Sequence, residues 1–230
     1  MAEVIEIARL GLHEQVANRL RTMLVEGRIA PGAKLNEREL CEQLRVSRTP
    51  LREAIKLLAA EGLVDLLPNR GAVAVKLGEA DVRHAFELLA HLEGLSGELA
   101  AQRVTDAELA EIRALHYEML AAFARSDLSG YYRINALVHA AINQAAANPV
   151  LTKTYREINS RVEALRFRTN QDAARWKQAV KEHEQMIQAL DARDAAALRN
   201  ILVQHLQHKR DSVLETLRAG PGSPQASRKP

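Results

Sequence analysis

The sequence has little of what marks secreted, disulfide-bonded or membrane-spanning proteins. Its 230 residues include one cysteine, Cys41, which excludes an intrachain disulfide and a thiolate metal cluster. No apolar run approaches the roughly 20 residues that a membrane-spanning helix needs. The first residues, MAEVIEIARLGLHEQ, lack the basic start and apolar core of a secretion signal. These absences predict a cytoplasmic protein that does not span a membrane.

The charge of the chain is modest but unevenly distributed. The formal net charge is +3 and the sequence pI is about 9.1, a mild indication of a polyanionic partner. Residues 45–56 contain one acid, Glu53, among four bases, whereas later segments mix both signs. We therefore expect a positively charged surface near the start of the chain.

Residues 12–76 predict a helix, a second helix, a turn, a third helix and a hairpin, in that order. Apolar residues recur every four positions from Leu12 to Leu24, as in an amphipathic helix. A short helix follows at residues 37–44, and the turn 45–47 leads to a third helix with Ser47 as its cap. Two short β-branched segments then flank the turn residues 68–71. This is the order of a winged helix-turn-helix.

The third helix divides into two faces. Leu51, Ile55 and Leu58 form an apolar stripe that suits packing inside its own domain. The other face carries Arg48, Arg52 and Lys56, four residues apart, and such a face is most often simply solvated. The surrounding winged helix favours a second interpretation, because the major groove of B-DNA admits one α-helix and Arg suits guanine acceptors.

The stretch PGAKLNERELCEQLRVSRTPLREAIKLLAAEGLVDLLPNRGAVAV resembles the DNA-binding domain of the GntR superfamily of bacterial transcription regulators. The match rests on P-G-x-x-L-x-E-R-E-L, S-R-T-P-x-R-E-A and the N-R-G-A wing, and it covers about residues 12–76. The resemblance implies that operator DNA is contacted by Arg38, Ser47, Arg48, Thr49, Arg52, Arg70 and Gly71.

From residue 79 onward the sequence carries no further strand signal. Helical segments are predicted at about 79–103, 105–125, 129–147, 149–168, 172–190 and 194–217. Thr105 is a predicted cap with Glu108 as its capping-box partner. We therefore expect a mainly α protein, with a winged helix-turn-helix of three helices and a hairpin at residues 8–77, an all-α six-helix bundle at 78–218 and a disordered tail at 219–230.

Three histidines of the second domain fall where the helical pattern calls for an apolar side chain. His183 and His205 lie on the apolar seams of the last two helices, and His139 lies one turn after Asn135 at the edge of a third. Inward imidazoles are often satisfied by carboxylates such as Glu93, or by water. Three imidazoles and an amide oxygen also suit Zn²⁺ or another first-row divalent ion. The spacing alone leaves both interpretations open.

Residues 79–217 resemble the FCD ligand-sensing domain of the FadR-type subgroup. The resemblance rests on L-E-G at residues 92–94, on N-x-x-x-H at 135–139 followed by N-P at 148–149, and on E-H at 182–183 with a final H-L at 205–206. It implies a divalent metal, with Zn expected and Ni or Mn as alternatives, together with a small organic acid effector. The implied metal ligands are Asn135, His139, His183 and His205.

The chain departs from the family pattern at two places in this site. Asn135 replaces the commoner Asp and removes a formal charge from the ligand set. Leu89 stands where many relatives carry an Arg suited to a carboxylate. Arg161 and Arg166 are the candidate substitutes for that Arg.

We therefore expect a homodimeric, operator-binding repressor whose affinity for DNA changes when a small carboxylate binds. Two alternative functions remain open. A metal-dependent hydrolase would use the His cluster to activate water, and it would leave the winged helix unexplained. An acyl-CoA sensor of the same fold would need no metal, but a long acyl chain favours an apolar cavity over inward histidines.

Overall fold

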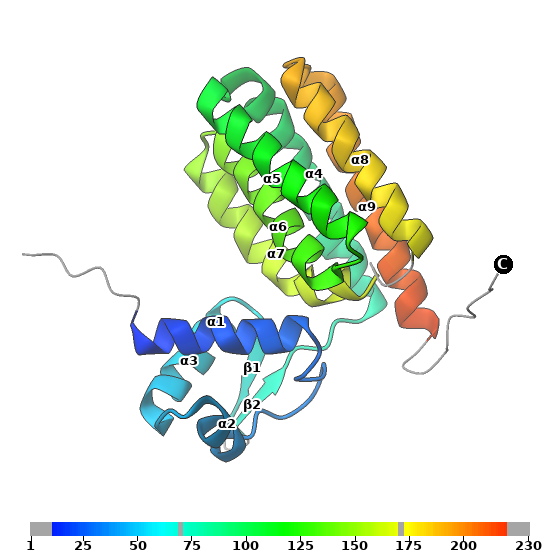
Figure 1. The fold of residues 1–230 in the computed structure, drawn as a ribbon. Helices are drawn as coiled ribbons and strands as arrows, with labels where there is room; N and C mark the ends of the chain where they lie inside the picture. Colours follow the sequence, from blue (N-terminus) through cyan, green and yellow to red (C-terminus); the bar gives the residue numbers. More distant parts are fainter. Residues whose placement is uncertain (1–10, 69–70, 170–172, 220–230) are drawn as a thin grey trace, which may run out of the picture. The chain divides into compact units, whose positions relative to one another are not determined.

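A computed structural model describes residues 11–68, 71–169 and 173–219, and the chain divides into two compact units, Met1–Lys76 and Leu77–Pro230 (Figure 1). The predicted mainly α fold with a small hairpin is confirmed. Of the predicted tail, Ala219 ends the last helix, and residues 220–230 lie outside the described residues.

In its described residues, 11–68 and 71–76, the first unit contains three helices and one hairpin around an apolar core. The predicted stripe of α1 is buried at Val16, Leu20 and Leu24, whereas Leu12, at the start of the helix, is 54% exposed. The elements are α1 (Leu12–Val25), α2 (Glu37–Leu44), α3 (Arg48–Ala60), β1 (Val64–Leu67) and β2 (Gly71–Ala74).

The turn between α2 and α3 is set by local backbone chemistry. The side chain of Asn36 accepts a hydrogen bond from the Arg38 amide at 3.2 Å and so begins α2. Arg45 ends α2 with a left-handed backbone, φ 55°. Ser47 occupies the N-cap position of α3 in an extended conformation, but its side chain makes no capping hydrogen bond, so the predicted cap is only positional.

The hairpin is a two-stranded antiparallel sheet with Val64 opposite Ala74 and Leu67 opposite Gly71. The free edge of β2 receives the segment before α2, where the Leu35 amide donates to the Ala72 carbonyl at 2.8 Å. Gly71 has φ +84°, a conformation that glycine adopts without the penalty of a side chain. The described part of β2 is thus hydrogen-bonded to the segment that leads into α2.

The second unit is a bundle of long helices, and Figure 1 shows them stacked along one another. The predicted capping box is confirmed at the start of α5, where Thr105 and Glu108 exchange capping hydrogen bonds. The helices are α4 (Glu79–Arg103), α5 (Asp106–Ala124), α6 (Leu128–Ala145), α7 (Pro149–Thr169), α8 (Ala173–Asp191) and α9 (Ala195–Ala219).

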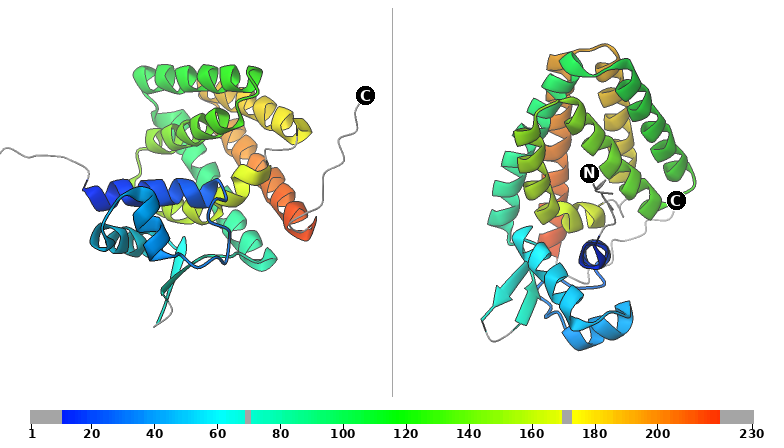
Figure 2. Two further views of the ribbon diagram at one scale, coloured as in Figure 1. Left: turned by 60° about the horizontal axis from the view of Figure 1, so that its bottom comes forward. Right: turned by 90° about the vertical axis from the view of Figure 1, so that its left-hand side faces the viewer.

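The most extensive helix pair of this bundle joins α4 and α9, which lie side by side in both views of Figure 2. Gly97 permits this approach, since a Cβ atom there would overlap Leu202 Cδ1 and lie 3.0 Å from Leu198 Cγ. Close backbone approach at a small residue brings the inner faces of the two helices together. No helix among the described residues is long and apolar enough to cross a membrane.

Candidate DNA interface and buried metal centre

The predicted DNA-contacting residues of the winged-helix unit that the structure describes are all exposed. On α3, Leu51, Ile55 and Leu58 are buried in the core, and the opposite face presents Arg48 and Arg52. The remaining described members of the predicted set, also exposed, are Arg38, Ser47, Thr49 and Gly71. Arg70 lies outside the described residues.

Three of these residues come from three elements and line one surface hollow. Arg38 lies on α2, Arg52 on α3 and Gly71 at the start of β2. The other residues of the hollow are Lys34, Leu35, Asn36, Glu37 and Glu39. The fold therefore brings together a concave face with an arginine from each helix of the helix-turn-helix, a lysine from the segment before α2 and the first residue of β2.

Arg52 is held by a carboxylate from another helix. Its Nε donates to Glu37 Oε2 at 2.9 Å, while the Arg52 side chain remains 60% exposed. This contact leaves the two terminal nitrogens of the guanidinium available for the acceptors on a guanine edge. Arg38 differs, because it pairs with Glu42 one turn along its own helix at 3.3 Å, between two exposed side chains. Such a pair contributes little to stability.

The helical unit gathers three buried imidazoles from three helices. His139 on α6, His183 on α8 and His205 on α9 are 3%, 0% and 2% exposed, and one ligand atom of each lies within 4.8 Å of the others. The Nε2 atoms of His139 and His183 are 3.1 Å apart. Two nitrogens bound at about 2.1 Å to one ion are separated by about 3.0–3.4 Å, so the spacing fits a shared metal.

Each imidazole is oriented from its outer side. His183 Nδ1 donates to the Ala179 carbonyl at 2.7 Å, and His205 Nδ1 lies 2.6 Å from Glu182 Oε2. His139 Nδ1 lies 2.8 Å from Glu93 Oε2, and Glu93 is itself buried. Acceptors at all three Nδ1 atoms leave the Nε2 atoms as the remaining candidate ligand atoms, and His205 Nε2 is buried without a hydrogen-bond partner.

The electrostatics of the cluster favour neutral imidazoles at His183 and His205. Burial, reinforced by neighbouring imidazoles, lowers the pKa of both His183 and His205 well below the ordinary value. Burial would raise the pKa of Glu93, but His139 and Arg166 outweigh it and lower that pKa to about 2. A neutral imidazole with a carboxylate behind it is the form in which histidine binds a metal ion.

The remaining predicted residues fall into two groups. Asn135 is buried on α6, one turn before His139, so helical spacing places its side chain on the same side of the helix as His139. Arg166 is also buried, with its Nη1 atom 3.6 Å from Glu93 Oε1. Arg161 is exposed on the same helix, so the structure separates the two arginines that the sequence left as alternatives.

Sequence reasoning missed two members of this region. Glu182 was identified only as part of a motif, yet it bridges His205 and the exposed His208, whose Nδ1 lies 2.7 Å from Glu182 Oε1. Lys209, the second, follows His205 by four residues and is 9% exposed. Helical spacing alone places it on the face of His205.

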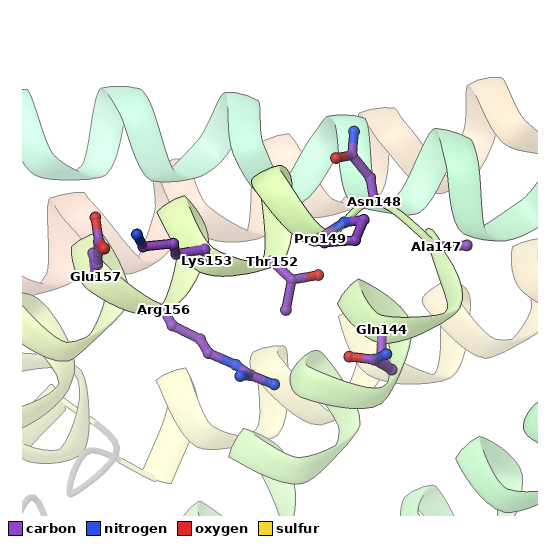
Figure 3. Close-up of a pocket in the computed structure, with 8 residues that line it drawn as sticks. All are labelled: Gln144, Ala147, Asn148, Pro149, Thr152, Lys153, Arg156 and Glu157. Carbon is purple, nitrogen blue, oxygen red and sulfur yellow. The ribbon is translucent and has the colours of Figure 1, made fainter.

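A separate surface groove lies where α6 turns into α7 (Figure 3). The side chains of Lys153, Arg156 and Glu157 rim it, and all three are exposed. The other lining residues are Gln144, Ala147, Asn148, Pro149 and Thr152. None of the predicted metal or effector residues lines this groove, so it is distinct from the buried cluster.

Comparison with known proteins identifies both units. Residues 12–73 match the family "Bacterial regulatory proteins, gntR family", and residues 84–208 match the FCD domain. The Nta operon transcriptional regulator of Aminobacter aminovorans is 31% identical over 201 residues, covering 85% of this chain and 91% of that protein. The HTH-type transcriptional repressor RspR of Escherichia coli is 27% identical over 202 residues, covering 88% and 89%.

Solved structures share the fold. E. coli McbR/YncC superposes with a TM-score of 0.81 at 24% identity, covering 91% of this chain and 100% of that one. A GntR regulator from Rhodococcus gives a TM-score of 0.73 at 21% identity, covering 88% and 97%. The chain belongs to the GntR family of bacterial regulatory proteins and is a transcriptional regulator with an FCD domain.

Proposed function

We propose that this regulator is a homodimeric repressor of the FadR-type subgroup, whose operator affinity changes when a small organic acid binds at a divalent metal ion in the helical unit. The observation that carries the proposal is the convergence of three buried imidazoles, each with an oxygen acceptor beside its Nδ1 atom. Two relatives described as repressors, RspR and a probable D-xylose utilization operon repressor of Paenarthrobacter nicotinovorans, favour repression.

The proposed ligands are His139, His183 and His205, with the amide oxygen of Asn135 beside them. Zinc suits this donor set, and nickel or manganese are alternatives. When bound, the ion supplies a Lewis-acid position for a carboxylate oxygen. The protein contributes the orientation of the imidazoles and the exclusion of water, because the three ligand side chains are almost completely buried.

The carboxylates near the cluster argue for a binding site over a hydrolytic one. Glu93 and Glu182 contact the Nδ1 sides of His139 and His205, away from the Nε2 atoms that converge. A general base must lie within reach of the water that it activates. Both acids are placed instead to orient imidazoles.

Two-fold symmetry follows from the mode of DNA binding that we propose. Helix-turn-helix regulators bind two half-sites, so that the symmetry of the protein matches that of the operator. Each chain would present α3 to one major groove. The effector then needs a coupling free energy of only about 1–3 kcal/mol to change operator affinity by several-fold to about a hundredfold.

The experiment that tests the metal centre is elemental analysis of purified full-length protein after dialysis against zinc. We expect one ion per chain in the parent and none in His183→Ala. A matched control is His116→Ala, which removes a buried histidine outside the cluster and should keep the ion. Equal metal content in the parent and His183→Ala would refute the proposed ligand set.

A further inference from the structure

The three imidazoles of the proposed metal centre are anchored by groups that differ in their access to solvent. Two of the anchors, the Ala179 carbonyl and Glu93, belong to buried residues. The third anchor is Glu182, which contacts His205 and whose side chain is 13% exposed. Exposed hydrogen bonds belong to the parts of a protein that open most easily. Among these three anchors, the contact of Glu182 with His205 is therefore the one that water can reach.

Glu182 determines which nitrogen of His205 is free to bind an ion. Its Oε2 atom lies 2.6 Å from His205 Nδ1, and a carboxylate oxygen only accepts, so the proton of the neutral ring is on Nδ1. Nε2 is then the unprotonated nitrogen, which is the form of imidazole that binds a metal ion. The same hydrogen bond fixes the orientation of the ring. Without it, the ring of His205 can turn and carry Nε2 away from the other two histidines.

Two further side chains hold Glu182 in place. Gln178, one helical turn earlier on α8, donates from Nε2 to Glu182 Oε1 at 2.9 Å. His208 Nδ1 lies 2.7 Å from the same oxygen and donates to it from α9. Gln178 Nε2 and His208 Nδ1 are 3.2 Å apart, so the two donors converge on one oxygen from neighbouring helices. Gln178, Glu182 and His208 together form the outer network.

The outer network leads from the buried cluster to the surface. The exposed fraction of the side chain rises from 2% for His205 to 13% for Glu182 and 54% for His208. His208 follows His205 by three residues, so both lie on the same side of α9. The cluster is thus connected to solvent along the contact of α8 with α9.

We propose that Gln178 and His208 are positioning residues for the metal site, which hold Glu182 against His205 and thereby retain the ion. This inference rests on the proposed metal site and identifies the side from which that site opens. Groups that orient a metal-binding histidine strongly affect metal affinity. Because this anchor is the one that water can reach, we expect loss of the ion to begin with His205.

The test measures how tightly zinc is held and how fast it leaves. Zinc-loaded full-length protein is mixed with an excess of a chromophoric chelator, which reports both the release rate and the dissociation constant. Glu182→Leu should raise the dissociation constant by about 10- to 100-fold, because it removes the anchor itself. His208→Leu and Gln178→Leu each leave one donor on Glu182, so we expect a smaller increase of about 3- to 10-fold, with faster release.

A conservative variant separates the hydrogen bond from mere packing. His208→Asn keeps an N–H group near the position of Nδ1 and should restore release to within about twofold of the parent rate. His91→Leu is the matched control, because it removes an exposed histidine from α4 and should leave release unchanged. The unfolding midpoint of the metal-free protein should be the same in the parent and in His208→Leu, as is usual for substitutions of exposed residues.

Three results would overturn the inference. The first is parent-like release in His208→Leu, and the second is equally fast release in His208→Asn and His208→Leu. The third is faster release in His91→Leu to the same extent. If His208→Leu does not fold, Gln178→Leu decides the question, because release at the parent rate in that variant would exclude the outer network as the anchor.

This inference and the proposed metal site fail in different ways. A parent protein that holds one zinc ion, with release unchanged by the substitutions of Gln178 and His208, would overturn the role of the outer network and leave the metal site standing. A parent protein that holds no zinc would overturn both.

Discussion

The two units of the chain use charge in opposite ways. In the winged-helix unit the described core is apolar, and the charged residues predicted to contact DNA are exposed. All of the buried polar and charged side chains in the described ranges belong to the helical unit, and most of them surround the histidine cluster. The first unit therefore folds around ordinary hydrophobic burial, whereas the second carries an interior that burial alone does not explain.

This difference separates an exposed surface that suits DNA from an interior that suits the proposed metal ion. Exposed charges can exchange water for phosphate with little penalty, so they suit a DNA interface. Buried polar groups cost free energy unless they have partners, and the partners found here position imidazoles around one point. The comparison predicts that ligands of the interior will stabilise one unit only.

The largest effect is expected from the metal. Free zinc at about 1,000 times its dissociation constant should raise the free energy of unfolding of the helical unit by about 4 kcal/mol, because the ion binds only the folded state. The winged-helix transition should not move. Thermal unfolding with and without zinc measures both transitions. His183→Ala should lose the response, and a response in that variant equal to the parent's would show that zinc binds elsewhere.

The next effect tests the packing that holds the cluster together. Gly97→Ala places a Cβ atom against Leu202 and Leu198 at the contact of α4 with α9. Overpacking of this kind should lower the stability of the helical unit by about 1–3 kcal/mol. Denaturant unfolding checks this value. An unchanged midpoint would mean that α4 and α9 are not in close contact at this position.

The predicted DNA-binding surface is tested through Arg52 and Glu37, the carboxylate that contacts it. Arg52→Ala should weaken binding to operator DNA by about 1–3 kcal/mol and leave the fold intact. Glu37→Gln should lower specific binding but raise binding to random DNA, because it frees Arg52 while removing a charge that repels phosphate. Competition shift assays measure both affinities.

Glu42→Gln provides the matched control for Glu37. It removes the exposed carboxylate that pairs with Arg38, so we expect only the increase in binding to random DNA. If Glu37→Gln and Glu42→Gln behave alike, the contact from Glu37 does not position Arg52. A fall in specific binding in Glu37→Gln alone would show that Glu37 positions Arg52, whereas equal changes in both variants would show only the loss of a charge that repels phosphate.

The last prediction concerns the pH dependence of stability that Lys209 contributes. Its pKa is about 7 in the fold and returns to its ordinary value of 10.5 on unfolding. Between these values the unfolded state binds more protons, so this contribution to stability rises with pH, by up to about 1.4 kcal/mol per pH unit, and falls as the pH drops towards 7.

Lys209→Met lacks this pH-dependent contribution to the free energy of unfolding. The stability difference, parent minus variant, should therefore grow from pH 7 to pH 9 in urea unfolding of the metal-free protein. Lys177→Met, which removes an exposed lysine of α8, should show no such trend. A difference that does not change with pH would mean that Lys209 is not desolvated in solution.

The sequence predicts helices and their faces better than it predicts which side chains contact one another across helices. The Thr105 and Glu108 box and the inward histidines follow from local spacing, which a helix translates directly into a face. Glu93 is predicted as a carboxylate partner of an inward histidine, and it lies 2.8 Å from His139. No local pattern predicts which histidine it contacts, or the contact of Glu182 with His205, because these contacts join different helices. Ser47 shows a related limit, because its position predicts the cap but not the missing hydrogen bond.

The choice between Arg161 and Arg166 was beyond the sequence for the same reason. The two residues are five apart on α7, and only the packing of the neighbouring helices decides which one is buried. The described ranges also stop short of Arg70, whose predicted contact with DNA stays a prediction.

The coupling between the two units is tested most directly by DNA affinity. The dissociation constant of zinc-loaded protein for DNA from upstream of its own gene is measured against random competitor DNA, with and without a saturating small organic acid. We predict a change of about 5- to 150-fold in the parent and none in His183→Ala. An affinity that is the same with and without every acid that binds would contradict the account, because the helical unit would then not control DNA binding.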